Sequence, residues 1–235
     1  MSRILFATAF LTGLVAAASV RADDKKQPEE RSKSSRRNVA IVIFNQMELL
    51  DFAGPAEVFA AADGGRAFKV YTVAENDKPI KSQGFVTITP QYTIENCPRP
   101  DILMIPGGNS TSVSKSQKMM DWVKQVSQNT EHVMSVCTGA FVLARAGLLD
   151  GLEATTHHGA ISALKRNHPN VKVRTDVRVV DNGKILTAAG VSAGIDGALH
   201  VVSKLRGQKV AQKTAEYMEY RWQVETAAST GTGGR

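Results

Sequence analysis

The chain has 235 residues, of which 43% are hydrophobic and 22% charged. This balance is ordinary for a folded domain with a buried core, and it excludes a chain that is disordered throughout. The formal net charge of +7 could indicate a nucleic-acid partner, but Arg31, Lys33, Arg36 and Arg37 carry much of it in one short polar segment, so we expect a soluble basic surface and no nucleic acid.

The first 22 residues differ from the rest of the chain. Arg3 is followed by an almost uncharged apolar run from Ile4 to Ala18, and the segment ends at the small residue Ala22. This pattern predicts a secretory signal peptide over residues 1–22, with cleavage after Ala22 and export to the periplasm or the extracellular space. A retained membrane anchor is the alternative, but the apolar run is shorter than the roughly 20 residues that a spanning helix needs.

Two further segments at the ends of the chain are polar. Residues 23–37 are dominated by Lys, Arg, Glu, Asp, Ser and Gln and contain no aliphatic residue, which predicts a disordered charged linker. Residues 227–235 are rich in Thr and Gly and predict a flexible tail. We therefore expect one folded domain over residues 38–226.

Strands and helices alternate through this domain. Asn38 to Phe44 and Ile102 to Ile105 are continuous apolar runs, which is typical of strands buried on both faces of a parallel sheet. The expected strands are residues 38–44, 68–74, 86–89, 102–105, 133–136, 154–156, 171–173, 177–180 and 184–188, and the expected helices are residues 55–62, 116–127, 139–146, 160–166, 193–205 and 209–220. The alternation predicts an α/β fold, a three-layer α/β/α sandwich around a mostly parallel, flavodoxin-like sheet.

Cys137 lies where an apolar strand meets a helix, in the segment Val133 to Gly151 (VMSVCTGAFVLARAGLLDG). Such a junction places a side chain at the carboxyl edge of the sheet, the geometry of a nucleophile elbow. The start of the following helix would favour the thiolate form of the sulfur. An isolated cysteine is more often a buried structural residue. The strand, Cys137, Thr138, Gly139 and helix in succession favour the nucleophile.

Two other loops are expected at the same edge. Asp51 follows the first strand, and its carboxyl group could act as a general acid or could simply cap the next helix, with neither role favoured by the sequence. Gly107 and Gly108 follow the strand Ile102 to Ile105, and their amides could bind a developing oxyanion or only make a turn.

His157 belongs to the segment Thr155-Thr156-His157-His158, which follows a short strand. A histidine near Cys137 could exchange protons or orient the sulfur and the substrate. Two adjacent histidines can also indicate a metal, but no Cys, His or Asp with ligand spacing surrounds them, so we expect neither a metal nor a cofactor.

The only two cysteines are expected to be free thiols. Cys97 precedes the strand Ile102 to Ile105, whereas Cys137 ends the strand at 133–136. If the strands are parallel neighbours, the two sulfurs lie at opposite strand ends, roughly 16 Å apart at about 3.3 Å per residue. A disulfide requires Cα atoms closer than about 7 Å.

Taken together, these motifs resemble the ThiJ/PfpI superfamily, relatives of class I glutamine amidotransferase domains. The resemblance extends from about Asn38 to Trp222 and is strongest to the isonitrile hydratase branch and to the corresponding domain of AraC-type regulators. The matching motifs are DFAGP at 51–55, IPGG at 105–108, SVCTGAFVLARAGLLDG at 135–151, ATTHH at 154–158 and AAGVSAGIDGALH at 188–200.

The resemblance implies a catalytic role for Cys137, Thr138 and Asp51, a small-molecule substrate and a homodimer. Many superfamily members have glutamate where Asp51 lies, so the aspartate favours the hydratase branch. One hypothesis is an enzyme in which Cys137 attacks an electrophilic carbon, as in hydration of an isonitrile or hydrolysis of a related compound. The alternative is a non-catalytic protein that senses oxidation through Cys137 or binds a ligand.

Overall fold

Residues 36–223 are described in the computed structural model of the protein. The expected signal peptide, the expected tail and all of the expected linker up to residue 35 lie outside these residues. Arg37, which the sequence assigned to the linker, instead opens the first strand. Among the described residues, no helix combines the length and the apolar character that crossing a membrane requires.

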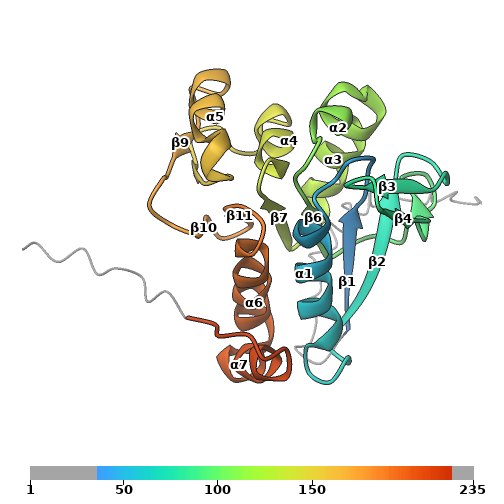
Figure 1. Ribbon diagram of the computed structural model, residues 1–235, viewed down its shortest axis with the longest axis vertical. Coiled ribbons are helices and arrows are strands. Elements are labelled where there is room, and N and C mark those ends of the chain that lie inside the picture. Colours follow the sequence, from blue (N-terminus) through green and yellow to red (C-terminus); the bar gives the residue numbers. More distant parts are fainter. Residues whose placement is uncertain (1–35, 224–235) are drawn as a thin grey trace, which may run out of the picture. The chain divides into compact units, whose positions relative to one another are not determined.

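A mostly parallel sheet forms the centre of the domain (Figure 1). Its strands follow the order β10-β11-β7-β6-β1-β2-β5, and each pairs with its neighbours in parallel except for the antiparallel pair β10 and β11. The strands are β1 (Arg37–Val42), β2 (Phe68–Ala74), β5 (Tyr92–Thr93), β6 (Ile102–Ile105), β7 (His132–Val136), β10 (Val179–Asp181) and β11 (Ile185–Ala188).

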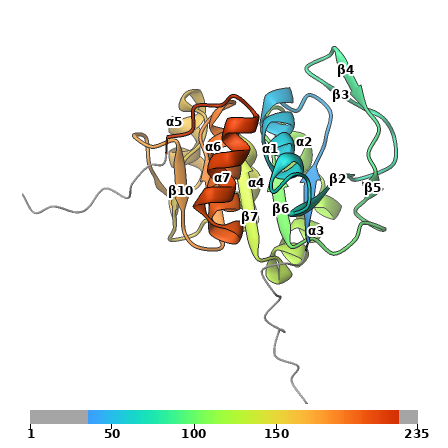
Figure 2. The same ribbon diagram turned by 90° about the horizontal axis from the view of Figure 1, so that it is seen from below.

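Helices cover both faces of this sheet (Figures 1 and 2). One face carries α1 (Leu49–Ala61), α6 (Ala193–Arg206) and α7 (Gln208–Tyr217), and the other carries α2 (Thr111–Lys115), α3 (Gln117–Asn129), α4 (Gly139–Arg145) and α5 (Ile161–Asn167). Two apolar clusters fill the space between the layers. On the first face, for example, the rings of Phe59 and Phe68 meet edge to face at 5.2 Å. The three-layer α/β/α sandwich is therefore confirmed.

The central strands end together at one edge because their registers are aligned. Every residue of β6 and β7 is buried, as in a parallel sheet that is covered on both faces. The sequence of β6 is continuously apolar, whereas β7 includes the buried polar residues His132 and Ser135. Ile105 pairs with Ser135, and Ala188 pairs with Val136. The loops that follow β6, β7 and β11 consequently start side by side, with Cys137 in the middle one.

Smaller elements differ from expectation. β3 (Ile80–Ser82) and β4 (Val86–Ile88) form a separate hairpin, of which the sequence indicated only the second strand. β8 (Glu153–Ala154) and β9 (Lys172–Val173) lie where strands were expected, yet they pair only with each other and not with the central sheet. A short 3₁₀ helix, His158–Ala160, precedes α5.

The first helix begins earlier than predicted. We expected its start near Pro55, because proline is favoured in a first turn, but α1 begins at Leu49 and Pro55 lies inside it. Proline lacks an N–H group, so the helix forgoes one backbone hydrogen bond at this point. The consequence is that Asp51 belongs to the first turn of α1 and not to a loop.

Candidate active site

Cys137 occupies a strained turn between β7 and α4. Its φ angle is 55°, a left-handed conformation that few residues other than glycine adopt. Neighbouring segments hold the turn: the Cys137 amide donates to the carbonyls of Ala188 (3.1 Å) and Ala189 (2.8 Å), and the Thr156 hydroxyl donates to the Cys137 carbonyl at 2.7 Å. The expected elbow, a tight turn with Cys137 between a strand and a helix, is therefore present in the fold.

Asp51 reaches Cys137 across 86 positions of sequence, as the convergence of loops at one sheet edge predicted. Electrostatic and hydrogen-bonding interactions couple the Asp51 carboxyl to the Cys137 thiol. Both side chains contact Gly107: a Cβ atom at this glycine would lie 2.7 Å from Asp51 Oδ2 and 2.7 Å from Cys137 Cβ. Asp51 is completely buried and Cys137 is only 7% exposed. The thiol thus lies in a nearly dry site, and not on an open surface.

The two oxygens of the Asp51 carboxyl differ in their hydrogen bonding. The Gly107 amide donates to Oδ2 at 2.9 Å, whereas Oδ1 is buried without a partner of hydrogen-bonding geometry among the described residues. Burial raises the pKa of Asp51 to about 7, and the charge of Glu48 acts in the same direction. The alternative role as a helix cap is wrong, because Glu48 occupies the N-cap position and Asp51 accepts from another loop.

The thiol is not activated in the way the sequence suggested. Burial, followed by the negative charge of Asp51, raises the pKa of Cys137 to about 12. α4 is only seven residues long, and its start does not outweigh these two effects. The expectation that the start of α4 favours the thiolate form of Cys137 is therefore wrong. Instead, Asp51 and Cys137 titrate as a coupled pair that retains one proton between them above neutral pH.

The glycine loop after β6 positions the site without offering free oxyanion donors. The Gly107 amide is engaged by Asp51, and the Gly108 amide donates to Thr138 Oγ1 at 3.0 Å. The Thr138 hydroxyl in turn donates to the Gly108 carbonyl at 2.9 Å. Both amides that the sequence assigned to an oxyanion therefore already have partners. Their contribution in this structure is to fix Asp51 and Thr138 on either side of Cys137.

His157 lies beside the elbow and lines a cavity of about 340 Å³ together with Val191. Its Nδ1 atom accepts a hydrogen bond from the Gly159 amide at 3.2 Å, and its ring lies 4.1 Å from that of His158. In this segment it is Thr156, not His157, that hydrogen-bonds to Cys137. No group of three or more His, Cys, Asp or Glu side chains within residues 36–223 is arranged to hold a metal ion. Cys97 and Cys137 are both free thiols.

Sequence reasoning gave no role to Val191 or Thr156. Val191 follows β11 and has a φ angle of 53°, which is exceptional for a β-branched residue. Its backbone amide interacts with the Asp51 carboxyl and lowers the pKa of Asp51, against the effect of burial. Val191 lies in the matched motif at 188–200, so its neighbourhood was visible in the sequence. Its backbone conformation was not.

The region of the chain that forms this domain is similar to known proteins. The sequence pattern of the DJ-1/PfpI family matches residues 37–204. An isonitrile hydratase from Pseudomonas putida is 32% identical over 186 residues, which cover 77% of this chain and 78% of that protein. The transcriptional regulator GbdR from Pseudomonas aeruginosa is 24% identical over 196 residues, or 82% of this chain, but this match spans only 52% of the regulator. A crystal structure of a ThiJ/PfpI family protein from Pseudomonas syringae superposes with a TM-score of 0.74 at 27% identity and covers 91% of this chain and 88% of its own.

Proposed function

The chain belongs to the DJ-1/PfpI family, and from this premise we propose that it is a small-molecule enzyme in which Cys137 is the nucleophile and Asp51 carries the proton. The proposed reaction is hydration of an isonitrile or of a related electrophilic carbon. The similarity to an isonitrile hydratase supports this choice. The observation that carries it is the coupling of a buried carboxyl, with a pKa raised to about 7, to the thiol of a strained elbow.

Hydration of an isonitrile needs one nucleophile and one group that both gives and takes a proton. The Cys137 thiol gives its proton to the ionised Asp51 as the sulfur forms a bond to the terminal carbon. Asp51 then passes this proton to the same carbon, which yields a thioimidate. Water then adds to that carbon: its oxygen forms the new C–O bond and its proton passes through Asp51 to the nitrogen. Loss of the hydroxyl proton to Asp51 and breakage of the C–S bond release an N-substituted formamide and restore the original pair.

The pKa values of the pair suit these steps. A carboxyl group with a pKa near 7 can both accept and release a proton near neutral pH, so it can take the proton of the thiol, pass it to the substrate carbon and act again in the later transfers. Proton transfer from sulfur to Asp51 creates the nucleophile only when a substrate is present. The high pKa of the thiol therefore protects the site from unproductive chemistry without preventing attack.

We also propose that the protein is exported and dimeric. Export rests on residues 1–22, which carry the signal-peptide pattern. The dimer rests on family resemblance alone. Mass spectrometry of the secreted form and light scattering of the purified protein measure these two properties directly.

A second candidate function is ligand binding without chemistry. The similarity to the transcriptional regulator GbdR favours it, because related chains of one fold can serve regulation as well as catalysis. Oxidation sensing is less well supported, since the most readily oxidised cysteines are exposed and of low pKa, whereas Cys137 is nearly buried with a raised pKa.

Turnover distinguishes these functions. The purified protein is incubated separately with an alkyl isonitrile, a dicarbonyl aldehyde and a short amide, and each product is quantified by chromatography. We expect formation of the formamide, loss of this activity in Cys137→Ala, and full activity in Cys97→Ala, which removes the other thiol. No turnover of any substrate, or equal turnover in Cys137→Ala, contradicts the proposal.

A further inference from the structure

The cavity beside the elbow has the size and the position of a substrate pocket. Its volume of about 340 Å³ lies within the range that accommodates small molecules. Val191 lines it, and the Val191 amide interacts with Asp51. Thr156, which donates to the Cys137 carbonyl, lines it as well. Two residues that contact the pair therefore also line the cavity, although Cys137 and Asp51 themselves do not.

Several polar side chains that can donate hydrogen bonds line this cavity, and of these the hydroxyls of Thr156 and Thr155 already donate to the carbonyls of Cys137 and Val177. Thr155, Thr156, His157, His158, Thr175 and Arg178 are among its lining residues, which include no Asp or Glu. Because Nδ1 of His157 accepts from a backbone amide, the proton of its neutral ring is on Nε2, which is then a donor. The carboxylates of the neighbouring segments are bound to arginines: Glu153 and Asp176 to Arg174, and Asp196 to Arg178.

Arg178 is the charged group of the cavity, and its orientation is fixed from behind. Its Nε and Nη2 atoms contact Asp196 Oδ2 at 2.7 and 2.6 Å, and Nη2 also donates to Ser192 Oγ at 3.2 Å. The Tyr220 hydroxyl donates to the other oxygen of Asp196 at 2.8 Å. Tyr220 also interacts with the guanidinium group itself. Nη1 takes part in none of the contacts with Asp196 and Ser192. A guanidinium group anchored along one edge loses little further entropy when the remaining edge binds an anion.

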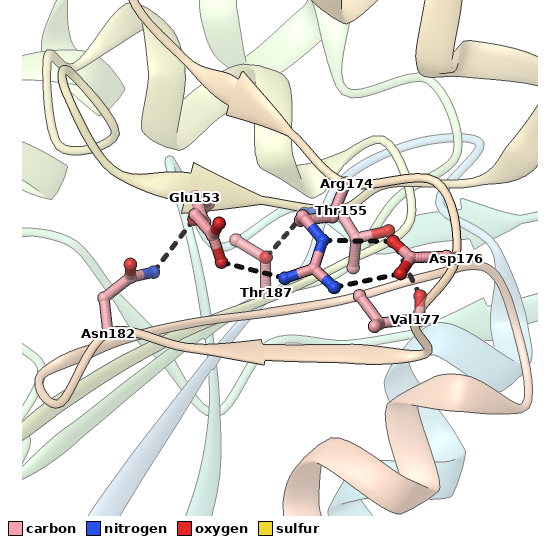
Figure 3. A network of polar contacts seen from close by, with 7 residues as sticks. All are labelled: Glu153, Thr155, Arg174, Asp176, Val177, Asn182 and Thr187. Carbon is pink, nitrogen blue, oxygen red and sulfur yellow. Dashed lines mark hydrogen bonds and ion pairs between the residues drawn. The ribbon is translucent and has the colours of Figure 1, made fainter. Parts of the chain in front are cut away.

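The wall that carries Thr175 and Arg178 is also held in place. Figure 3 shows Arg174 between Glu153 and Asp176, with Nη1 3.0 Å from Glu153 Oε2 and Nη2 2.9 Å from Asp176 Oδ2. In the same view the partners of Thr155 are not carboxylates. Its amide donates to Thr187 Oγ1 at 2.9 Å, and its hydroxyl faces the Val177 carbonyl. The donors of the cavity thus stand on a preformed wall and not on an unsupported loop.

We propose that this cavity binds a carboxylate substituent of the substrate, with Arg178 as the residue that determines specificity. The inference rests on the proposed function, because it names the class of compound that the Cys137 site acts on. An anionic group fits a cavity that contains a fixed arginine, several donors and no lining carboxylate. The substrate class is therefore a small isonitrile with a carboxylate a few bonds from the reacting carbon.

A matched pair of substrates tests this specificity. Isocyanoacetate and methyl isocyanoacetate share the reacting carbon and differ in charge, and their hydration yields N-formylglycine and its methyl ester. We expect the wild type to prefer isocyanoacetate in kcat/KM. Loss of a charged hydrogen bond in Arg178→Gln should reduce this preference by about 10- to 100-fold, and Arg178→Lys should lie between the two.

The control for the charge change is Arg166→Gln, at an exposed position of α5 that does not line the cavity. It removes the same charge and should leave the preference unchanged. Because the measured quantity is a ratio between two substrates, a general loss of activity in Arg178→Gln does not move it. Equal kcat/KM for both substrates in the wild type, or a preference that survives in Arg178→Gln, overturns the proposal while the proposed function stands.

Product binding separates failure of this proposal from failure of the proposed function. N-formylglycine and N-formylglycine methyl ester are titrated by calorimetry into Cys137→Ala, in which no turnover occurs. If neither isonitrile is hydrated but N-formylglycine binds in an Arg178-dependent manner, the carboxylate site stands and only the reaction is wrong. Absence of any difference between the two ligands overturns the site.

Discussion

Replacing Asp51 with asparagine should stabilise the folded protein at alkaline pH while it removes most of the activity. In the unfolded chain this carboxyl ionises with a pKa of 3.8, whereas burial raises the folded pKa to about 7. Below about pH 3 both states hold the proton and the group has no effect on stability. As the pH rises toward 7, the unfolded state releases its proton first, so the folded state becomes progressively less stable relative to it.

The size of the effect follows from the shift in pKa. A difference of about 3 pKa units corresponds to about 4 kcal/mol, which is fully developed once the pH exceeds the folded pKa. Asparagine keeps an oxygen that can accept from the Gly107 amide, at present 2.9 Å away, but it does not ionise. The free energy of unfolding of Asp51→Asn, minus that of the wild type, should therefore increase by up to about 4 kcal/mol between about pH 4 and pH 8.

Urea unfolding at a series of pH values measures this difference, because titrations that the two proteins share cancel in the subtraction. In parallel, kcat for isonitrile hydration should fall by about 10²- to 10⁴-fold in the variant, the usual contribution of a general acid or base. A stability difference that does not change with pH would show that Asp51 keeps an ordinary pKa, and the reasoning about the shared proton would be refuted.

Three other substitutions probe the surroundings of the pair. Gly107→Ala introduces a Cβ atom 2.7 Å from Asp51 Oδ2 and from Cys137 Cβ, so it should separate the pair, destabilise the fold by about 1–3 kcal/mol in urea and lower kcat. Thr156→Val removes the 2.7 Å hydrogen bond to the Cys137 carbonyl and should cost about 1–3 kcal/mol in the same assay. Arg174→Gln should scarcely change Tm, because its ion pairs are exposed, but should accelerate hydrogen exchange at residues 174–178; unaltered exchange there would show that Arg174 does not hold the segment.

Much of the fold could be predicted because its signals are local. The apolar run Ile102 to Ile105 predicts a buried strand, and β6 has these bounds. The succession of strand, Cys137 and helix located the elbow without any long-range information. The start of α1 was missed because Pro55, usually a first-turn residue, is accommodated within the helix. The β3 strand was missed because Ile80 is its only apolar residue, whereas β4, equally short, has two.

The electrostatics of the site depended on tertiary structure and could not be predicted. The sequence shows that Cys137 precedes a helix, which favours a thiolate. It does not show that the thiol is buried and lies next to Asp51. Burial, and after it the charge of Asp51, raise the pKa of Cys137 and outweigh the effect of the helix. Likewise, Arg178 stands in the sequence as one of several basic residues. Only the folded chain shows that Asp196 anchors it at the wall of a cavity next to the elbow.

The pH dependence of Cys137 alkylation tests the coupling of thiol and carboxyl most directly. Iodoacetamide labelling, followed by peptide mass spectrometry that distinguishes Cys137 from Cys97, gives the rate at each pH. In the wild type we expect the rate at Cys137 to rise through a transition near pH 7, where Asp51 loses its proton and can accept that of the thiol. In Asp51→Asn the transition should disappear, and labelling should begin only at alkaline pH, where the buried thiol itself ionises. The same transition near pH 7 in both proteins would contradict the account.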